Sequence, residues 1–200
     1  MHTEVPVLNR YYGVFESGKI KVRGIEAVRR DTPPLVGEAQ MDMIRVLSRA
    51  SSSQAFTKTI PEAVEVLTGY VDKLRKGDVD VQDLIIAKQL SMDPSRYAHD
   101  VFQAIAAKQL MREGIEVNAG QRVHYVITDA QNKRPDRRVR AAQLIKAETR
   151  PDVKKYTDML VLAGANILSP FGYDEEMLKD RIVYGEKQTV LKPALETTAA

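Results

Sequence analysis

The chain has 200 residues, 44% of them hydrophobic and 28% charged, and it contains no cysteine. This composition is typical of a globular protein with room for one substantial domain, and it excludes a disulfide framework, thiolate metal sites and cysteine nucleophiles. The first residues lack the apolar run of a signal peptide, and the longest apolar stretch near the C-terminus, residues 159–165, is too short to cross a bilayer. We therefore expect a cytoplasmic protein with no membrane partner.

Positive charge is concentrated in two short stretches, although the formal net charge is only +3. Residues 1–30 carry six Lys/Arg against three acids, and residues 131–155 carry nine against three. Such a distribution is typical of a polyanion partner, because counterion release drives phosphate binding. Charge alone leaves a second interpretation open, in which both stretches are solvated basic loops.

The first predicted element is a β-hairpin. Residues 10–15 and 19–23 are strand-like, and residues 16–18, with the sequence Glu-Ser-Gly, are typical of a tight turn. Pro33 and Pro34 then favour the start of a helix that runs to about residue 49.

A helical body with a few strands is predicted to follow. The serine-rich residues 50–57 indicate a mobile connection, and Thr59 is the candidate cap of a helix that stops at Gly77. The further elements, in chain order, are a buried strand at 83–90, a helix at about 100–113, a strand at 122–128, a basic loop at 132–140 and a long helix at about 153–168.

The sequence thus predicts an α+β fold, with an N-terminal β-hairpin followed by a mainly helical domain with a few strands. We place the hairpin unit at residues 1–33, the helical domain at 34–185 and a flexible tail at 186–200. Because a lone hairpin is marginally stable in water, it is expected to complete a sheet that lies elsewhere.

Residues that could support independent catalysis are not grouped in the sequence. The carboxylates are scattered, and His2, His99 and His124 lack the spacing of metal ligands. Neither a glycine-rich phosphate loop nor a serine nucleophile motif is found. We expect no catalytic residue on this chain.

Residues 9–31, NRYYGVFESGKIKVRGIEAVRRD, carry the most specific pattern. Tyr11 is followed by Gly-Lys-Ile at 18–20, Arg-Gly-Ile-Glu at 23–26 and Arg-Arg-Asp at 29–31. This pattern resembles the segment of archaeal family-B DNA polymerases that lies just downstream of the catalytic carboxylates of the palm. Weaker similarity to the thumb continues over nearly all of residues 7–185. One departure is Asn9, which replaces the lysine of the family's Lys-x-Tyr motif, so the phosphate contact of that position should be weaker or come from Arg10.

The resemblance implies a non-autonomous component of a DNA-directed DNA polymerase. The chain would be the thumb with the palm edge, gripping and positioning primer–template DNA for a catalytic palm on another chain. Its partner would be a large subunit with exonuclease, fingers and palm, and Mg²⁺ is expected in that palm rather than here. The chain would then be the small subunit of a split, heterodimeric polymerase, or a fragment of a longer one; Met1 only a few residues before Tyr11 fits a small subunit. Tyr156-Thr157-Asp158 superficially resembles the polymerase tyrosine–aspartate motif, but it falls in a helical pattern and is expected to face solvent.

The expected DNA-contacting residues come from the hairpin segment and from the thumb. Lys19, Lys21 and Arg23 alternate and should share one face of their strand, and a glycine at 24 would let the backbone approach a phosphate. The alternative is an exposed hairpin with solubilising cations. The hairpin candidates are Arg10, Tyr11, Lys19, Lys21, Arg23, Gly24, Arg29 and Arg30, and the thumb candidates are Lys88, Ser91, Lys108, Arg134, Arg137 and Arg138.

Two further interpretations stay open. Gln188 and Leu191 resemble the start of a sliding-clamp-binding peptide, although its aromatic positions are Ala194 and Leu195, and the alternative is a frayed tail. At the level of function, the alternative is a stand-alone, non-catalytic nucleic-acid-binding protein derived from a polymerase thumb. An unrelated enzyme is a third reading, which the absent motifs oppose.

Overall fold

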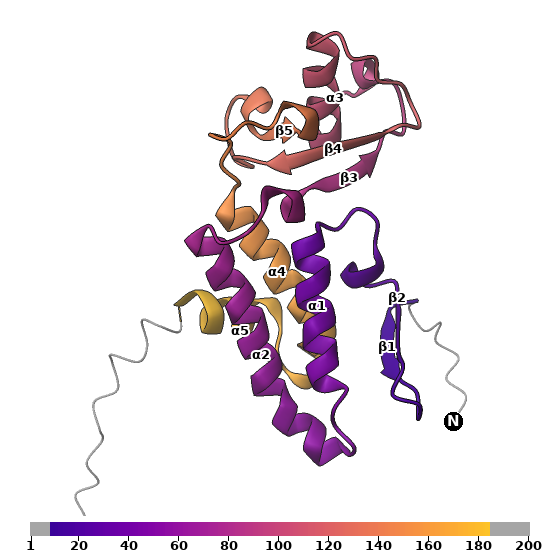
Figure 1. Cartoon of the computed structure of the whole chain (residues 1–200), viewed down its shortest axis with the longest axis vertical. Helices are drawn as coiled ribbons and strands as arrows, with labels where there is room; N and C mark the ends of the chain where they lie inside the picture. The colour runs from indigo at the N-terminus through magenta and orange to yellow at the C-terminus, as the bar shows by residue number, and fades with distance from the viewer. Residues whose placement is uncertain (1–8, 185–200) are drawn as a thin grey trace, which may run out of the picture.

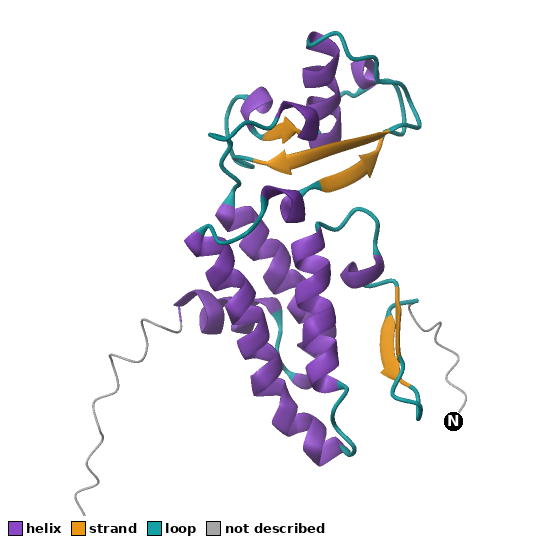
Figure 2. Cartoon of the chain, in the orientation of Figure 1, coloured by secondary structure: helices purple, strands orange, loops and turns teal. Residues whose placement is uncertain are grey.

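The computed structural model describes residues 9–184. The chain forms an elongated molecule, with a helical part below, a small sheet with its own helix above, and the N-terminal hairpin beside the helices (Figure 1). Figure 2 shows the same division by secondary structure, with strands in the hairpin and in the upper part. The α+β architecture expected from the sequence is confirmed. Among the described helices, none is both long and apolar enough for a membrane span.

The hairpin pairs strand β1 (Tyr11–Val14) with strand β2 (Ile20–Arg23) in antiparallel register. Its turn is closed by the Phe15 amide donating to the Lys19 carbonyl at 3.0 Å, and Gly18 takes a φ of 77° that favours glycine. Tyr12, Ile20 and Val22 are partly buried against the core. The hairpin therefore has an inner apolar face and an outer polar face.

Residues 25–31 join the hairpin to the helical part. Ile25 is 3% exposed, and the short 3₁₀ helix Glu26–Val28 follows it. The fully buried Gln40 of α1 (Pro34–Leu47) accepts from the Ala27 amide at 2.7 Å and donates to Glu26 at 2.8 Å. Buried polar side chains need hydrogen-bond partners. Residues 26 and 27 supply such partners to Gln40, so the joining segment packs as part of the helical body.

Helix α2 (Ser53–Lys76) begins earlier than the sequence predicted. Ser52, not Thr59, is the N-cap, and its side chain accepts from the Ala55 amide. Pro61 lies inside the helix. Residues 53–57, expected in a mobile connection, form the first turns, and the predicted stop at Gly77 is confirmed with a left-handed φ of 78°.

The upper part contains an antiparallel sheet in the order β3-β4-β5, formed by β3 (Ile86–Gln89), β4 (Arg122–Ile127) and β5 (Val139–Ala141). Helix α3 (Phe102–Arg112) packs on this sheet. The expected strand at 83–90 is shorter, because Val81–Leu84 forms a 3₁₀ helix. The expected basic loop at 132–140 contains a 3₁₀ turn, Pro135–Arg137, and the start of β5.

Helix α4 (Val153–Leu168) has the predicted bounds and packs with α1 and α2, and α5 (Glu175–Lys179) packs on α4. The expectation that residues 156–158 face solvent is wrong for Tyr156, which is fully buried, and for Thr157, which is 7% exposed. Its hydroxyl donates to the Leu84 carbonyl at 2.7 Å and accepts from the Ile127 amide at 2.9 Å. Tyr156 thus joins the helical part to the upper sheet, and Asp158 pairs with Lys179 at 3.2 Å.

Candidate nucleic-acid interface

The outer face of the hairpin gathers one aromatic ring and several cations. Tyr11 and Arg23 are register partners, and the Lys21 ammonium lies 5.9 Å from the centre of the Tyr11 ring. The Arg23 guanidinium beside the Tyr11 hydroxyl lowers the pKa of Tyr11, and Lys21 acts in the same direction. Tyr11, Lys21 and Arg23, with Lys19 at the turn end, are exposed; we name these four residues the hairpin surface.

This surface has the chemistry of a phosphate-binding face. Lys21 and Arg23 project together because side chains on alternate positions of β2 share one face, and Lys19 lies just before that strand. No ion pair within 4.0 Å joins Lys19, Lys21 or Arg23 to a carboxylate of the described residues. Their charges are therefore available to an external anion.

Gly24 has an intrachain reason to be glycine. Its φ is 70°, and a Cβ atom there would lie 2.0 Å from the carbonyl oxygen of Asn9. The residue is thus required by the close crossing of residues 9 and 24 at the end of the hairpin. The expected approach of this backbone to a phosphate stays a prediction.

Two other predicted cations are paired within the chain. The Arg29 guanidinium donates to both carboxylate oxygens of Asp31 at 3.1 Å, and the Lys88 ammonium lies 2.6 Å from the same carboxylate. These contacts connect the segment after the hairpin to strand β3 of the upper sheet. A phosphate contact by Arg29 or Lys88 would have to compete with Asp31.

The remaining candidates are dispersed. Arg10 and Arg30 are exposed near the hairpin, whereas Lys108 is half-buried on α3. The Ser91 amide donates to the Tyr97 hydroxyl at 2.9 Å, and the two hydroxyls lie 3.1 Å apart. The Ser91 hydroxyl lowers the pKa of Tyr97. Gln188 and Leu191 fall outside the described residues.

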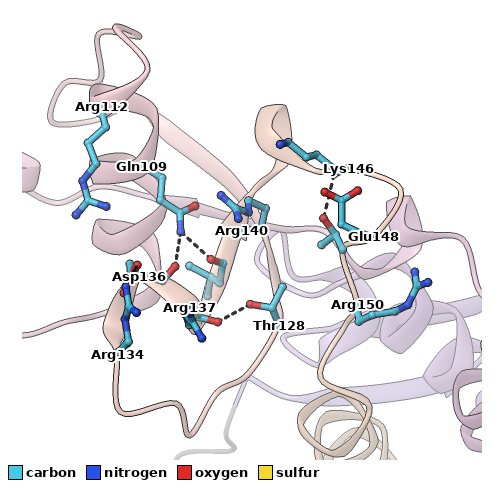
Figure 3. A pocket seen from close by; sticks show the side chains of 12 residues that line it. Gln109, Arg112, Thr128, Arg134, Asp136, Arg137, Arg140, Lys146, Glu148 and Arg150 are labelled. Carbon is cyan, nitrogen blue, oxygen red and sulfur yellow. Dashed lines mark hydrogen bonds and ion pairs between the residues drawn. The ribbon is translucent and has the colours of Figure 1, made fainter.

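A second group of cations surrounds a cavity of about 420 Å³ on the upper part, which we name the basic pocket (Figure 3). Arg134 and Arg137 contribute to it from the short 3₁₀ segment after β4, as expected from the charge pattern. Arg138 instead donates through Nε to the Asn132 carbonyl at 2.7 Å. Four further cations complete the lining: Arg112, Arg140, Lys146 and Arg150.

Sequence reasoning missed these four residues as site residues. Arg140, Lys146 and Arg150 lie within the basic stretch 131–155, so the excess of charge could have indicated them. Arg112 gave no such signal, because it comes from the end of α3 and only the fold brings it to the pocket.

Carboxylates and histidines do not form a metal site in the described part of the chain, where no three such side chains gather suitably. The two-metal arrangement of polymerase chemistry needs carboxylates that hold both ions. The described residues therefore do not fit catalytic Mg²⁺.

The comparisons identify the family. The chain belongs to DNA polymerase family B, whose family model matches residues 9–171. DNA polymerase 2 of Aeropyrum pernix is 34% identical over 171 residues, which are 85% of this chain and 20% of that protein. DNA polymerase of Thermococcus aggregans is 30% identical over 171 residues, covering 85% of this chain and 9% of that protein.

A solved structure agrees with this assignment. The family B DNA polymerase of the hyperthermophilic archaeon Pyrobaculum calidifontis superposes with a TM-score of 0.65 and 25% identity, over 80% of this chain and 20% of that one. The archaeal family-B resemblance predicted from residues 9–31 is confirmed. The chain spans about a fifth of the Aeropyrum and Pyrobaculum polymerases.

Proposed function

We propose that this chain is the DNA-gripping thumb and palm edge of a family-B DNA polymerase, and that it positions primer–template duplex for a catalytic palm on another chain. The hairpin surface is the observation that carries the proposal. Lys21 and Arg23 lie beside Tyr11, and no carboxylate of the described residues pairs with them or with Lys19, as a surface that receives phosphates requires. Additional contacts to the phosphate backbone of DNA are proposed for Arg10, Arg30, Ser91 and Lys108.

The hairpin also supports the proposal of a palm partner. It forms a two-stranded sheet among the described residues, so its outer strand edges have unused backbone donors and acceptors. Val14 and Phe15 are 45% and 51% exposed. A neighbouring palm sheet would pair these edges and cover these side chains. The partner would be a large subunit with exonuclease, fingers and the Mg²⁺-binding palm. A sliding-clamp contact by Gln188 and Leu191 is a proposal from the sequence pattern alone.

The first test measures duplex binding by Lys21→Ala/Arg23→Ala. Loss of two phosphate contacts should weaken binding on the order of 10- to 100-fold at about 0.1 M salt, because two fewer counterions are released. The matched control is Lys58→Ala/Lys73→Ala, which removes two exposed cations from α2. Equal losses in both variants would show that only net charge matters and would contradict the assignment.

The second test is reconstitution of primer extension. The isolated chain should extend no primer in the presence of Mg²⁺, and a family-B chain that carries the palm carboxylates but lacks a thumb should gain extension when this chain is added. Deletion of residues 1–24 should abolish that gain, since the deletion removes the hairpin and leaves Ile25 and the segment after it. Full stimulation by the deleted chain would show that the palm contact lies elsewhere, and stable duplex binding without any stimulation would favour the stand-alone DNA-binding alternative.

A further inference from the structure

The basic pocket concentrates positive charge beyond what the chain itself neutralises. Six cations line it, against two carboxylates, Asp136 and Glu148. Arg134 pairs with Asp136 at 3.5 Å. The other five cations, Arg112, Arg137, Arg140, Lys146 and Arg150, make no ion pair within 4.0 Å among the described residues. Like charges held around one cavity repel one another unless an anion lies between them.

The walls of the pocket are fixed by hydrogen bonds, two of which are buried. Gln109 is 6% exposed; its amide nitrogen donates to the carbonyls of Asp136 and Val139 at 2.9 and 2.8 Å, and its oxygen accepts from the Ala141 amide at 2.9 Å. The Thr128 hydroxyl donates to the Arg137 carbonyl at 2.7 Å (Figure 3). These contacts hold the backbone on both sides of Arg137 and Arg140. The cations are therefore presented by an ordered frame.

The position and lining of the pocket indicate which anion fits. The pocket lies in the upper part around β5, at the far end of the molecule from the tip of the β1–β2 hairpin (Figure 1). Among the described residues that line it, no aromatic side chain offers a surface on which a single-stranded base could stack. Its volume of about 420 Å³ equals about 14 water volumes of roughly 30 Å³, which is more than one tetrahedral anion fills.

We propose that the basic pocket binds a compact oligophosphate chain, at a site separate from the hairpin surface. Adjacent phosphates would receive charge-assisted hydrogen bonds from Arg137 and Arg140 on one wall and from Lys146 and Arg150 on the other. The ligand is either a free inorganic oligophosphate or the triphosphate group of a nucleotide. This site does not depend on whether the hairpin surface binds DNA.

The experiment is calorimetric titration of the full chain with inorganic tripolyphosphate at fixed ionic strength. Arg137→Gln/Arg140→Gln should raise the Kd about 10- to 100-fold, the range for loss of charge-assisted hydrogen bonds. Lys58→Gln/Lys73→Gln, which removes two exposed cations from α2, is the matched control and should leave the Kd unchanged. A second pocket variant, Arg112→Gln/Arg150→Gln, alters exposed side chains away from the 3₁₀ segment and should also weaken tripolyphosphate binding. Weaker binding by both variants could not be explained by misfolding of the first variant alone.

Parallel titrations distinguish the sources of the ligand. Equal Kd values for tripolyphosphate and a nucleoside triphosphate would support the proposal and show that the pocket recognises the phosphate chain alone. A lower Kd for the nucleotide would support the proposal and identify the nucleotide as the ligand. Three results would overturn the proposal: sulfate binding as tightly as tripolyphosphate, retention of tripolyphosphate binding by both pocket variants, or a short single-stranded DNA binding more tightly than either phosphate at the pocket.

Discussion

At the scale of single residues, Asp31 connects two parts of the chain that are distant in sequence. It accepts from Arg29, two positions earlier, and from Lys88, fifty-seven positions later. The Arg29 guanidinium, followed by the Lys88 ammonium, lowers the pKa of Asp31 below its ordinary value. The sequence pattern includes the Arg29-Arg30-Asp31 run, but the role of Asp31 depends on Lys88, which only the fold brings near.

Asp31→Asn should lower the free energy of unfolding by about 1 kcal/mol at neutral pH, since the ion pairs are partly exposed. Because folding depresses the pKa of Asp31, its stabilisation is fully present above the ordinary Asp pKa of about 3.9 and is lost as the pH falls through the folded value. Urea unfolding of both proteins should show a constant difference above about pH 5 that shrinks in acid. Asp78→Asn, at an exposed carboxylate that makes no ion pair among the described residues, should show no such difference. Identical curves for the wild type and Asp31→Asn would contradict this role.

At the scale of elements, the start of α2 shows where sequence reasoning failed. Pro61 after Thr59 is typical of a first helical turn, yet the helix begins at Ser53. A proline there removes the amide that would bond to the carbonyl of Thr57, and Thr57 is exposed, so water can satisfy that carbonyl. The free-energy cost of a proline inside this helix is thereby reduced. The N-terminal cap comes from Ser52.

Ser52→Ala should destabilise the protein by about 1 kcal/mol, the usual effect of losing a side-chain cap. Thr59→Ala should cost less, because the Thr59 hydroxyl only donates to the Phe56 carbonyl within the helix. Thermal unfolding of the two variants tests this directly. A larger loss of stability in Thr59→Ala than in Ser52→Ala would indicate that Thr59, rather than Ser52, caps the helix.

Other elements were predictable to different degrees for physical reasons. The bounds of α4 and the turn of the hairpin follow from local signals, a helical apolar period and a turn glycine. Strand β5 has only three residues, which is too short a run for its alternating pattern to indicate a strand from the sequence. It forms because Val126 and its neighbours in β4 pair with it.

At the scale of the whole molecule, the upper sheet and the helical part share one hydrophobic core and are joined by specific polar contacts. Tyr156 bridges Leu84 and Ile127, and Lys88 reaches Asp31. The residues that make up the hairpin surface could be predicted from the sequence, because they lie close together in it. The basic pocket could be predicted only in part, because Gln109 and Arg112 reach it through tertiary packing.

The most direct test of the central claim, that the hairpin surface grips duplex DNA through phosphates, is the salt dependence of binding. The slope of log K against log salt should be less steep by roughly two units in Lys21→Ala/Arg23→Ala than in the wild type, since each lost phosphate contact removes about 0.9. Lys58→Ala/Lys73→Ala should keep the wild-type slope. An unchanged slope in the hairpin variant would show that Lys21 and Arg23 do not contact DNA, and would contradict the proposed interface.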